Sequence, residues 1–310
     1  MKHIPGKYKN HNVFIIFAWL LMTAGCTNKK PVIVFQSDFG LKDGAVSAMK
    51  GVCLEVDPDI HMYDLTHEIP GYNVWEAAYR LQQTAPYWPA GTVFVSVVDP
   101  GVGTDRKSVV LKTTTGHHFV GPDNGSFTLV SESLGIESVR RIDEELNRRK
   151  NSSTSNTFHG RDVYAYTAAR LASGRIKFEE VGPLLPDSLV RLNYQRAMME
   201  GDSIVGNIPI LDVQYGNVWT NIGDTLFRKL NLKEGDKVDV SIRHADSVVY
   251  VGRMPFVATF GAVPEGEVLS YFNSLMNVAF AINMANFADS FRIRNGPQWN
   301  VTLRKSKLGK

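Results

Sequence analysis

The loop Val98–Arg106 holds the most conspicuous group of polar side chains in the sequence. It follows a strongly β-prone run, and Asp99 stands at its start. Gly101 and Gly103 suggest a phosphate-binding loop, because glycine lets backbone N–H groups approach a phosphate closely. A dinucleotide fingerprint needs a third glycine where Arg106 stands, however, and a Walker loop needs Gly-Lys followed by Ser or Thr. Neither pattern is present, and the simplest alternative is a strand that ends in a proline-glycine turn.

A second polar motif is Phe158–Asp162, with the sequence Phe-His-Gly-Arg-Asp. A single histidine such as His159 is more often structural than catalytic. This one follows a polar segment and begins a helix-like run that continues to Leu171. Because the first N–H groups of a helix have no partners within it, a helix start is a suitable place for a polar site. We interpret His67 and the pair His117-His118, which lack such a context, as structural or surface residues.

A third candidate is the segment 212–221, which contains Asp212, Asn217 and Trp219 around a turn at Tyr215–Asn217. Acid, amide and indole groups at one turn can recognise a heteroaromatic ligand by hydrogen bonds and stacking. The pattern is unspecific. A hairpin with a buried tryptophan explains it almost as well.

The elements that must position these motifs alternate between strands and helices. Apolar or β-prone runs predict strands at Val32–Phe35, Ile60–Leu65 and Thr92–Val98, and helical spacing of apolar residues predicts helices at Gly44–Val56 and Val74–Gln83. This alternation is typical of an α/β domain with a mainly parallel sheet. Such sheets bind ligands beyond the carboxyl ends of their strands, which is where Asp38 and Asp99 stand.

The pattern changes after about residue 185. Pro183, Pro186 and the polar stretch Asn193–Asp202 indicate a linker. Beyond it, apolar and polar residues alternate as in half-exposed antiparallel strands, at Ile204–Val213, Lys237–Ile242 and Ser247–Val251. We therefore predict an N-terminal α/β domain over residues 26–185, a linker over 186–199 and a mostly β domain over 200–310.

Composition describes an ordinary globular protein of 310 residues, 44% of them hydrophobic and 21% charged. The formal charge of +3 arises from Lys2, Lys7 and Lys9, since without these three of the 34 basic residues the count is 31 basic to 31 acidic. A nucleic-acid partner is not expected, because nothing provides a basic surface for phosphates. Cys53 reads as a buried apolar residue, and the absence of a Cys/His set in the sequence gives no reason to expect zinc or another metal.

The first 25 residues resemble a secretory signal peptide. Basic residues precede the apolar run Val13–Met22, and the small residues Thr23, Ala24 and Gly25 lead to Cys26. The run is too short to cross a bilayer, which takes about 20 residues. Ala-Gly-Cys resembles a bacterial lipobox, although Thr23 departs from it. We expect an exported lipoprotein anchored to a membrane through acylated Cys26, facing the periplasm or outer membrane. The alternative is an ordinary cleaved signal in which Cys26 is incidental.

Taken together and in order, six segments resemble the S-adenosylmethionine hydroxide adenosyltransferase family, whose members hydrolyse S-adenosylmethionine and are related to fluorinases and chlorinases. The segments are Ser37–Gly40, Asp64–Ile69, Val98–Gly103, Gly121–Gly125, Phe158–Asp162 and Gly216–Asn221. The resemblance extends from about Val32 to Phe291. It implies an N-terminal α/β domain and a C-terminal antiparallel β-barrel. It also implies homotrimers in which each active site lies between the N-terminal domain of one subunit and the C-terminal domain of its neighbour.

The same resemblance implies the site residues. The water-activating triad of the family falls on Asp99, Arg106 and His159, in which Asp99 and His159 accept hydrogen bonds from water and Arg106 steadies developing hydroxide. The substrate is bound by Asp38 at the ribose hydroxyls and by further contacts to the nucleoside and the methionine end. These further positions are Tyr72, Phe158, Asn193, Asp212, Asn217, Trp219, Ser274 and Ile282. The sulfonium is already a good leaving group, so orientation and exclusion of water suffice, without a cofactor.

Water rather than halide is the expected nucleophile. The halogenases carry a tyrosine or similar residue at the position of Asp99 and a serine at that of Gly160. Two departures from the family pattern, Met276 for a usual glycine and Ala279 for a usual glutamate, affect the adenine segment. The expected reaction is hydrolysis of S-adenosyl-L-methionine to adenosine and L-methionine, by attack of water on ribose C5′. The alternatives are a lipid-anchored protein that binds a nucleoside without catalysis, and a halogenase.

Overall fold

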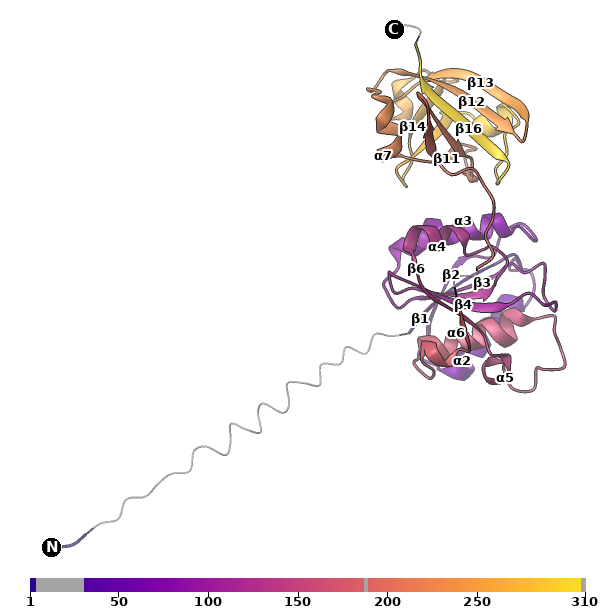
Figure 1. Ribbon diagram of the computed structural model, residues 1–310, viewed down its shortest axis with the longest axis vertical. Coiled ribbons are helices and arrows are strands. Elements are labelled where there is room, and N and C mark those ends of the chain that lie inside the picture. The colour runs from indigo at the N-terminus through magenta and orange to yellow at the C-terminus, as the bar shows by residue number, and fades with distance from the viewer. Residues whose placement is uncertain (4–30, 187–188, 308–310) are drawn as a thin grey trace.

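A seven-stranded mixed sheet forms the centre of the N-terminal domain in the computed structural model, which describes residues 1–3, 31–186 and 189–307 (Figure 1). Its strands lie in the order β2-β1-β3-β5-β4-β6-β7. They are β1 (Val32–Ser37), β2 (His61–Thr66), β3 (Val93–Val97), β4 (Ser108–Thr113), β5 (His118–Pro122), β6 (Ile136–Arg141) and β7 (Leu184–Leu185). The strands β2, β1, β3 and β5 pair in parallel, whereas β4, β6 and β7 extend the sheet by antiparallel pairing.

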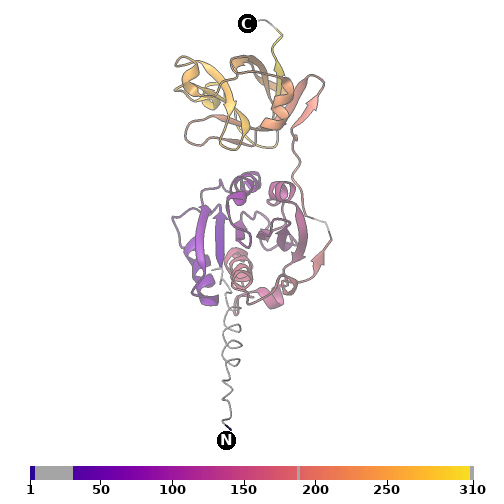
Figure 2. The ribbon, with the colours of Figure 1, turned by 90° about the vertical axis from the view of Figure 1, so that its left-hand side faces the viewer.

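Helices cover both faces of this sheet (Figures 1 and 2). One face carries α2 (Ala45–Val56) and α6 (Tyr166–Ala172), and the other carries α3 (Val74–Thr84) and α4 (Thr128–Leu134). Successive side chains of a strand point to opposite faces, so β1 places Ile33 and Phe35 in the first core and Val34 in the second. Burial on both faces explains why this strand is a continuous apolar run.

The strands and helices predicted around the polar motifs are present, with boundaries shifted by a few residues. The prediction of a mainly parallel sheet holds for β1, β2, β3 and β5 only. Three of the six pairings are antiparallel. One of these, β4–β5, is imposed by a tight turn in which Thr113 N donates to His117 O at 2.9 Å and which folds β5 back beside β4. A connection this short can join only antiparallel strands. The short helix α5 (Glu144–Asn147) and a π-helix (Gly160–Ala165) complete the domain near the site, with 3-10 turns at Ala85–Tyr87 and Phe178–Glu180.

The C-terminal domain consists of two antiparallel sheets, one with the order β10-β11-β15-β14 and the other β13-β12-β16-β9-β8. Apolar side chains from both sheets pack between them in one core. The strands are β8 (Met198–Glu200), β9 (Ser203–Asn207), β10 (Ile210–Leu211), β11 (Val218–Gly223), β12 (Lys237–His244), β13 (Ser247–Pro255), β14 (Val268–Phe272), β15 (Asn277–Ile282) and β16 (Trp299–Lys305). The helices are α7 (Asp224–Phe227) and α8 (Phe287–Ser290), with 3-10 turns at Arg228–Leu230 and Phe260–Ala262.

An extended segment joins the two domains (Figure 1), and side chains of the two domains also touch directly. In this segment the Tyr194 hydroxyl donates to Glu132 Oε2 at 2.5 Å, which holds the segment against α4. Across the domain contact the Trp75 indole N–H donates to the carbonyl of Pro209 at 2.8 Å. Tyr79 and Ile210 pack in the same apolar cluster beside it.

His118 makes the stability of the N-terminal domain dependent on pH. Burial, with a smaller contribution from Lys112, lowers its pKa from 6.5 to about 4. The unfolded chain therefore takes up a proton at higher pH than the folded chain, and we expect the free energy of unfolding to fall as the pH drops from 6.5 toward 4. Urea titrations across this range should show a flatter dependence for His118→Gln. If the free energy of unfolding depended on pH equally in the variant and the wild type, His118 would not be the source of the dependence.

Candidate functional site

Asp99 and Asp38 stand at the same edge of the sheet. β1 and β3 are parallel neighbours with Ser37 opposite Val97, so the residues that follow the two strands leave the sheet together. Carboxyl ends of parallel strands are where ligands of α/β sheets bind. The topology therefore brings Asp38 and Asp99 to the same edge, at the carboxyl ends of β1 and β3.

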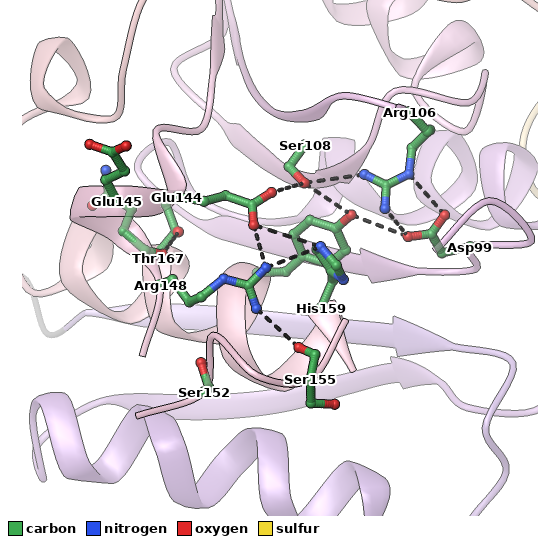
Figure 3. Close-up of polar contacts among 12 residues, drawn as sticks. Asp99, Arg106, Ser108, Glu144, Glu145, Arg148, Ser152, Ser155, His159 and Thr167 are labelled. Carbon is green, nitrogen blue, oxygen red and sulfur yellow. Dashed lines mark hydrogen bonds and ion pairs between the residues drawn. The ribbon is translucent and has the colours of Figure 1, made fainter. Parts of the chain in front are cut away.

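Arg106 holds the Asp99 carboxylate through two hydrogen bonds (Figure 3). Its Nε donates to Oδ1 at 3.0 Å and its Nη2 to Oδ2 at 2.5 Å. The side chains are 10% exposed for Arg106 and 6% for Asp99, so the pair lies in a largely water-free environment. A bidentate guanidinium–carboxylate pair fixes both groups in one plane. The loop between β3 and β4 thus brings these two residues together although seven positions separate them in sequence.

Tyr164 and Ser108 extend this pair. The Tyr164 hydroxyl donates to Asp99 Oδ2 at 3.2 Å, and Arg106 Nη1 donates to Ser108 Oγ at 3.1 Å. Ser108 in turn donates to Glu144 Oε1 at 3.3 Å. Burial, together with the Asp99 charge, raises the pKa of the Tyr164 phenol, so it remains a donor at neutral pH.

His159 precedes the π-helix and faces a second ion pair (Figure 3). Arg148 donates to Glu144 Oε2, and the same Arg148 Nη2 lies 3.3 Å from His159 Nε2. The imidazole is 9% exposed. Burial is the main cause that lowers the pKa of His159, and Arg148 adds to it while Glu144 opposes it. His159 is therefore neutral near pH 7.

The ribose-binding candidate Asp38 is positioned by backbone and by a buried histidine. Asp38 Oδ2 accepts from the backbone N–H of Tyr72 at 2.9 Å. His67 holds the loop from the other side, because its Nδ1 lies 2.6 Å from Ser37 Oγ and its carbonyl accepts from Gly40 N at 2.7 Å. His67 is buried and supports the loop that carries Asp38, which agrees with its interpretation as a structural residue.

Two aromatic candidates accompany this edge. Phe158 packs edge-to-face on Phe39, with ring centroids 5.8 Å apart. Tyr72 is 76% exposed and adopts φ of +66°, a strained conformation for a residue other than glycine. An aromatic side chain held open in this way is available to a flat ligand.

The C-terminal candidates form a separate group. Asn217 Nδ2 donates to Asp212 Oδ2 at 3.2 Å, and the Asp212 N–H donates to the Asn217 carbonyl at 2.8 Å. Both residues and Ile282 line a hollow of about 650 Å³, whose lining comes entirely from the C-terminal domain. Trp219 lies on β11 beside it, within an apolar cluster that includes Tyr271.

Two of the expected contacts lie elsewhere. Ser274 lines the cleft of about 460 Å³ between the two domains of the same chain. Asn193 lies in the joining segment, next to Leu192, whose N–H donates to Thr128 Oγ1 at 2.9 Å. Within one chain, the structure therefore gathers the N-terminal candidates at the sheet edge and Asp212, Asn217 and Ile282 at a different surface.

Met276 and Ala279, the two departures from the family pattern, lie at positions with distinct backbone and packing constraints. Met276 adopts φ of +59°, a conformation that glycine takes without penalty and other residues adopt at a cost of about 1–2 kcal/mol. Ala279 is fully buried in β15, opposite Trp219 and Tyr271. The glycine that is usual at position 276 in the family would adopt this positive φ without strain.

Gly160 has little room for a side chain. A Cβ at this position would lie 2.8 Å from Val97 Cγ1 and 3.3 Å from Met49 Sδ. We expect Gly160→Ser to destabilise the protein by about 1–3 kcal/mol through overpacking, and to yield no halogenated nucleoside. Thermal unfolding and a product assay with fluoride or chloride test this. Gly44→Ser is the matched control, since nothing lies within 4 Å of its Cβ. Halide transfer by the Gly160→Ser variant would contradict the prediction.

Four residues of the network were missed by the sequence interpretation. They are Ser108, Glu144, Arg148 and Tyr164. The only local signal was the spacing of four between Glu144 and Arg148, which is also that of an ordinary helix ion pair. Ser108 and Tyr164 join the site through strand pairing and helix packing, which no short motif encodes.

Comparison with known proteins gives this site a family. The model of the SAM hydroxide adenosyltransferase N-terminal domain matches residues 33–182, and that of the C-terminal domain matches residues 206–300. The chain is 35% identical to an (R)-S-adenosyl-L-methionine hydrolase of Methanocaldococcus jannaschii, over 83% of this chain and 87% of that protein. It is 37% identical to one of Salinispora tropica, over 88% and 98%. Proteins named fluorinase also align, at 26–29% identity.

A solved structure agrees with these matches. An uncharacterized conserved protein of Thermotoga maritima superposes with a TM-score of 0.78 at 35% identity, over 88% of this chain and 100% of that protein. The likeness extends through both domains.

The expectation of an exported, membrane-anchored lipoprotein is wrong. The hydrolases that align with 83–88% of this chain bear names of enzymes of S-adenosyl-L-methionine, and none of these names is that of a lipoprotein. The apolar run Val13–Met22 and Cys26 lie outside the described residues. The expectation rested on a pattern of a few residues, from which Thr23 already departed. Among the helices that the structure describes, none is long and apolar enough to cross a membrane.

Both family models match in order and together span most of the chain, and the curated relatives align over nearly their whole length. The fold places an acidic residue and its arginine at the sheet edge where such sheets bind ligands. This chain belongs to the S-adenosylmethionine hydroxide adenosyltransferase family.

Proposed function

We propose that the protein hydrolyses S-adenosyl-L-methionine to adenosine and L-methionine. The relatives named (R)-S-adenosyl-L-methionine hydrolase, at 35–37% identity over most of the chain, support this reaction. The observation that carries it in the structure is the buried Asp99–Arg106 pair at the carboxyl edge of the sheet. S-adenosyl-L-methionine is the substrate, and the reaction needs no cofactor.

The chemistry is one displacement. The oxygen of a water molecule bonds to ribose C5′ as the C5′–sulfur bond breaks, and the bonding pair stays on sulfur to give the thioether of methionine. Water loses one proton. Because the sulfonium leaves readily, the task of the site is to hold one water in line with the C5′–S bond and to exclude others.

We assign Asp99, Arg106 and His159 the role of positioning and activating the attacking water, and Asp38 the role of binding the ribose hydroxyls. Asp99 Oδ1 accepts one hydrogen bond, from Arg106, among the described residues, so it retains lone-pair capacity for a water. A vicinal diol can donate both hydroxyls to one carboxylate, which suits Asp38. Tyr72 and Phe158 contribute the flat surfaces for the nucleoside. Asn193, Asp212, Asn217, Trp219, Ser274 and Ile282 are the further substrate contacts of this proposal.

We further propose that the active site forms between subunits of a homotrimer. The N-terminal candidates and the hollow around Asp212 lie on different domains, and each has large exposed side chains. Tyr72 is 76% exposed at the first, and Tyr215 and Met284 are 67% and 79% exposed at the second. Exposed apolar surface of this kind marks contact sites. A neighbouring chain that brings its hollow to the sheet edge would complete the site.

We also propose the domain organisation. The N-terminal domain spans residues 26–185, a linker spans 186–199, and residues 200–310 form a C-terminal β-barrel. The two C-terminal sheets approach each other at both sides. Asn207 N at the end of β9 donates to Asn221 Oδ1 on β11 at 2.7 Å, and an isolated bridge joins Phe256 to Ser270 of β14. These contacts support a closed barrel.

The test follows product formation by the purified full chain. Adenosine and methionine should appear in equal amounts, and in H₂¹⁸O the label should enter the 5′-hydroxyl of adenosine. Asp99→Asn and His159→Ala should each lose at least about 100-fold in kcat, while adenosine binding measured by calorimetry survives. Adenosine binding without turnover by the folded wild type would indicate a binding protein, and 5′-halogenated product in fluoride or chloride would indicate a halogenase.

A further inference from the structure

His159 contacts a partly buried ion pair between Arg148 and Glu144, which the assigned roles do not use (Figure 3). Arg148 Nη2 lies 3.3 Å from His159 Nε2, and Glu144 Oε2 lies 3.7 Å from the same nitrogen. The Arg148 side chain is 12% exposed. We propose that Arg148 and Glu144 are positioning residues that hold His159 in one tautomer, with the proton on Nδ1 and Nε2 as an acceptor. The consequence for catalysis rests on the proposed function.

The tautomer follows from the donor inventory. A guanidinium has five N–H donors and no acceptor, so a hydrogen bond between Arg148 and Nε2 has only one direction. Nε2 must offer its lone pair, and a neutral imidazole then carries its proton on Nδ1. Glu144 accepts from the same Arg148 nitrogen and therefore fixes the guanidinium in place. Ser108 donates to the other Glu144 oxygen, which ties this contact to Arg106 and Asp99.

This tautomer changes the role of His159. Its Nδ1 is buried and has no hydrogen-bond partner among the described residues. A buried N–H without an acceptor costs about 1–3 kcal/mol, which is tolerated where a ligand supplies the acceptor. We assign that acceptor to the oxygen of the attacking water. His159 then donates to the nucleophile, and Asp99 takes the proton that the water loses as the bond to C5′ forms.

The charges around His159 favour the neutral form. Burial comes first in lowering its pKa, and Arg148 and Arg106 lower it further, whereas Glu144 and Asp99 raise it. Arg148 and Glu144 come from α5 and the residue after it, Arg106 and Asp99 from the loop after β3, and the Tyr164 ring from the π-helix, 6.3 Å away between centroids. Removal of Arg148 takes away one opposing cation and leaves Glu144. Nε2 can then take up a proton and pair with that carboxylate.

The experiment measures the tautomer directly. Nitrogen NMR of the full chain with ¹⁵N-labelled histidine, assigned with a His159→Gln sample, should show Nδ1–H and a bare Nε2 in the wild type at pH 7. In Arg148→Met the pKa of His159 should rise. Protonation of Nε2 leaves the Nδ1–H donor in place but adds a positive charge near Asp99, which weakens that carboxylate as a base. The acid limb of the kcat/KM profile should therefore move to higher pH, and kcat near pH 6.5 should fall about 10-fold while KM changes less than about twofold. Arg148→Lys keeps a cationic donor and should restore most of the activity.

Arg149→Met is the matched control. Arg149 follows Arg148 in the chain, but its guanidinium pairs with Glu55 at the surface, where the side chains are 38% and 57% exposed. This variant should keep both the histidine spectrum and the pH profile of the wild type. A proton on Nε2 in the wild type, or an unchanged tautomer and pH profile in Arg148→Met, would overturn the inference. Failure of the folded wild type to release adenosine would instead reject the proposed function, since the spectra do not depend on turnover.

Discussion

Replacing Arg106 by methionine is expected to remove hydrolase activity and to lower the free energy of unfolding by about 3–5 kcal/mol. Asp99 is 6% exposed, and Arg106 supplies two of its three hydrogen bonds among the described residues. Without the guanidinium, a carboxylate is left almost buried with only the Tyr164 hydroxyl as a partner. Urea unfolding gives the loss of stability, and the release of adenosine gives the loss of activity.

Two further variants separate the causes. The double variant Asp99→Asn/Arg106→Met leaves no buried charge, so it should recover a large part of the lost stability and remain inactive. Arg228→Met removes an exposed partner of Asp224, with side chains 67% and 32% exposed, and should change stability by at most about 1 kcal/mol. If Arg106→Met were as stable as Arg228→Met, the Asp99–Arg106 pair would not be a buried electrostatic contact.

Two inactive variants are expected to regain activity when they assemble together. Asp99→Asn disables the N-terminal half of the proposed site, and Asp212→Ala disables the C-terminal half. If each site joins the N-terminal domain of one chain to the C-terminal domain of the next, random assembly in equal amounts gives about one intact site in four, and about one in three in the mixed trimers that carry both tags. Co-expression with two affinity tags, followed by tandem purification and an adenosine assay, measures this directly.

The pairing Asp99→Asn with His159→Ala is the control for complementation. Both changes lie in the N-terminal half, so a mixed assembly contains no intact site and should stay inactive. Activity from the first mixture and none from the second supports sites between chains. No activity from a mixed assembly of Asp99→Asn and Asp212→Ala chains would place the complete site within one chain and reject the proposed arrangement.

The position of the catalytic candidates was predictable because it depends on short-range patterns. A buried strand reads as a continuous apolar run, and the polar residue that ends it must emerge at the sheet edge. Asp38 and Asp99 follow β1 and β3 in this way. His159 could be placed near a helix start by the same kind of local signal. The ordered motifs then identified the family, which the family models and relatives confirm.

The antiparallel pairing of β4, β6 and β7 was harder to predict from the sequence. β4 carries buried residues like those of β3, whereas β6 buries only Val139, and nothing in the composition of either strand states the direction in which it pairs. That direction is set by the short turn before β5 and by the return of the chain after α4. The resemblance of the N-terminal segment to a lipobox misled in a different way. There a short pattern predicted a membrane-anchored lipoprotein, which the comparisons contradict.

The sequence by itself determined which residue types stand at the strand ends, that a carboxylate and a guanidinium follow β3, and to which family the chain belongs. Tertiary structure decided what surrounds them. Ser108, Glu144, Arg148 and Tyr164 enter the network from β4, α5, the residue after it and the π-helix, and no local pattern marks them. Hydrogen-bond direction in such a network depends on which donors and acceptors meet in a largely buried space. Only the packed fold fixes that, and here it turns His159 Nε2 toward Arg148.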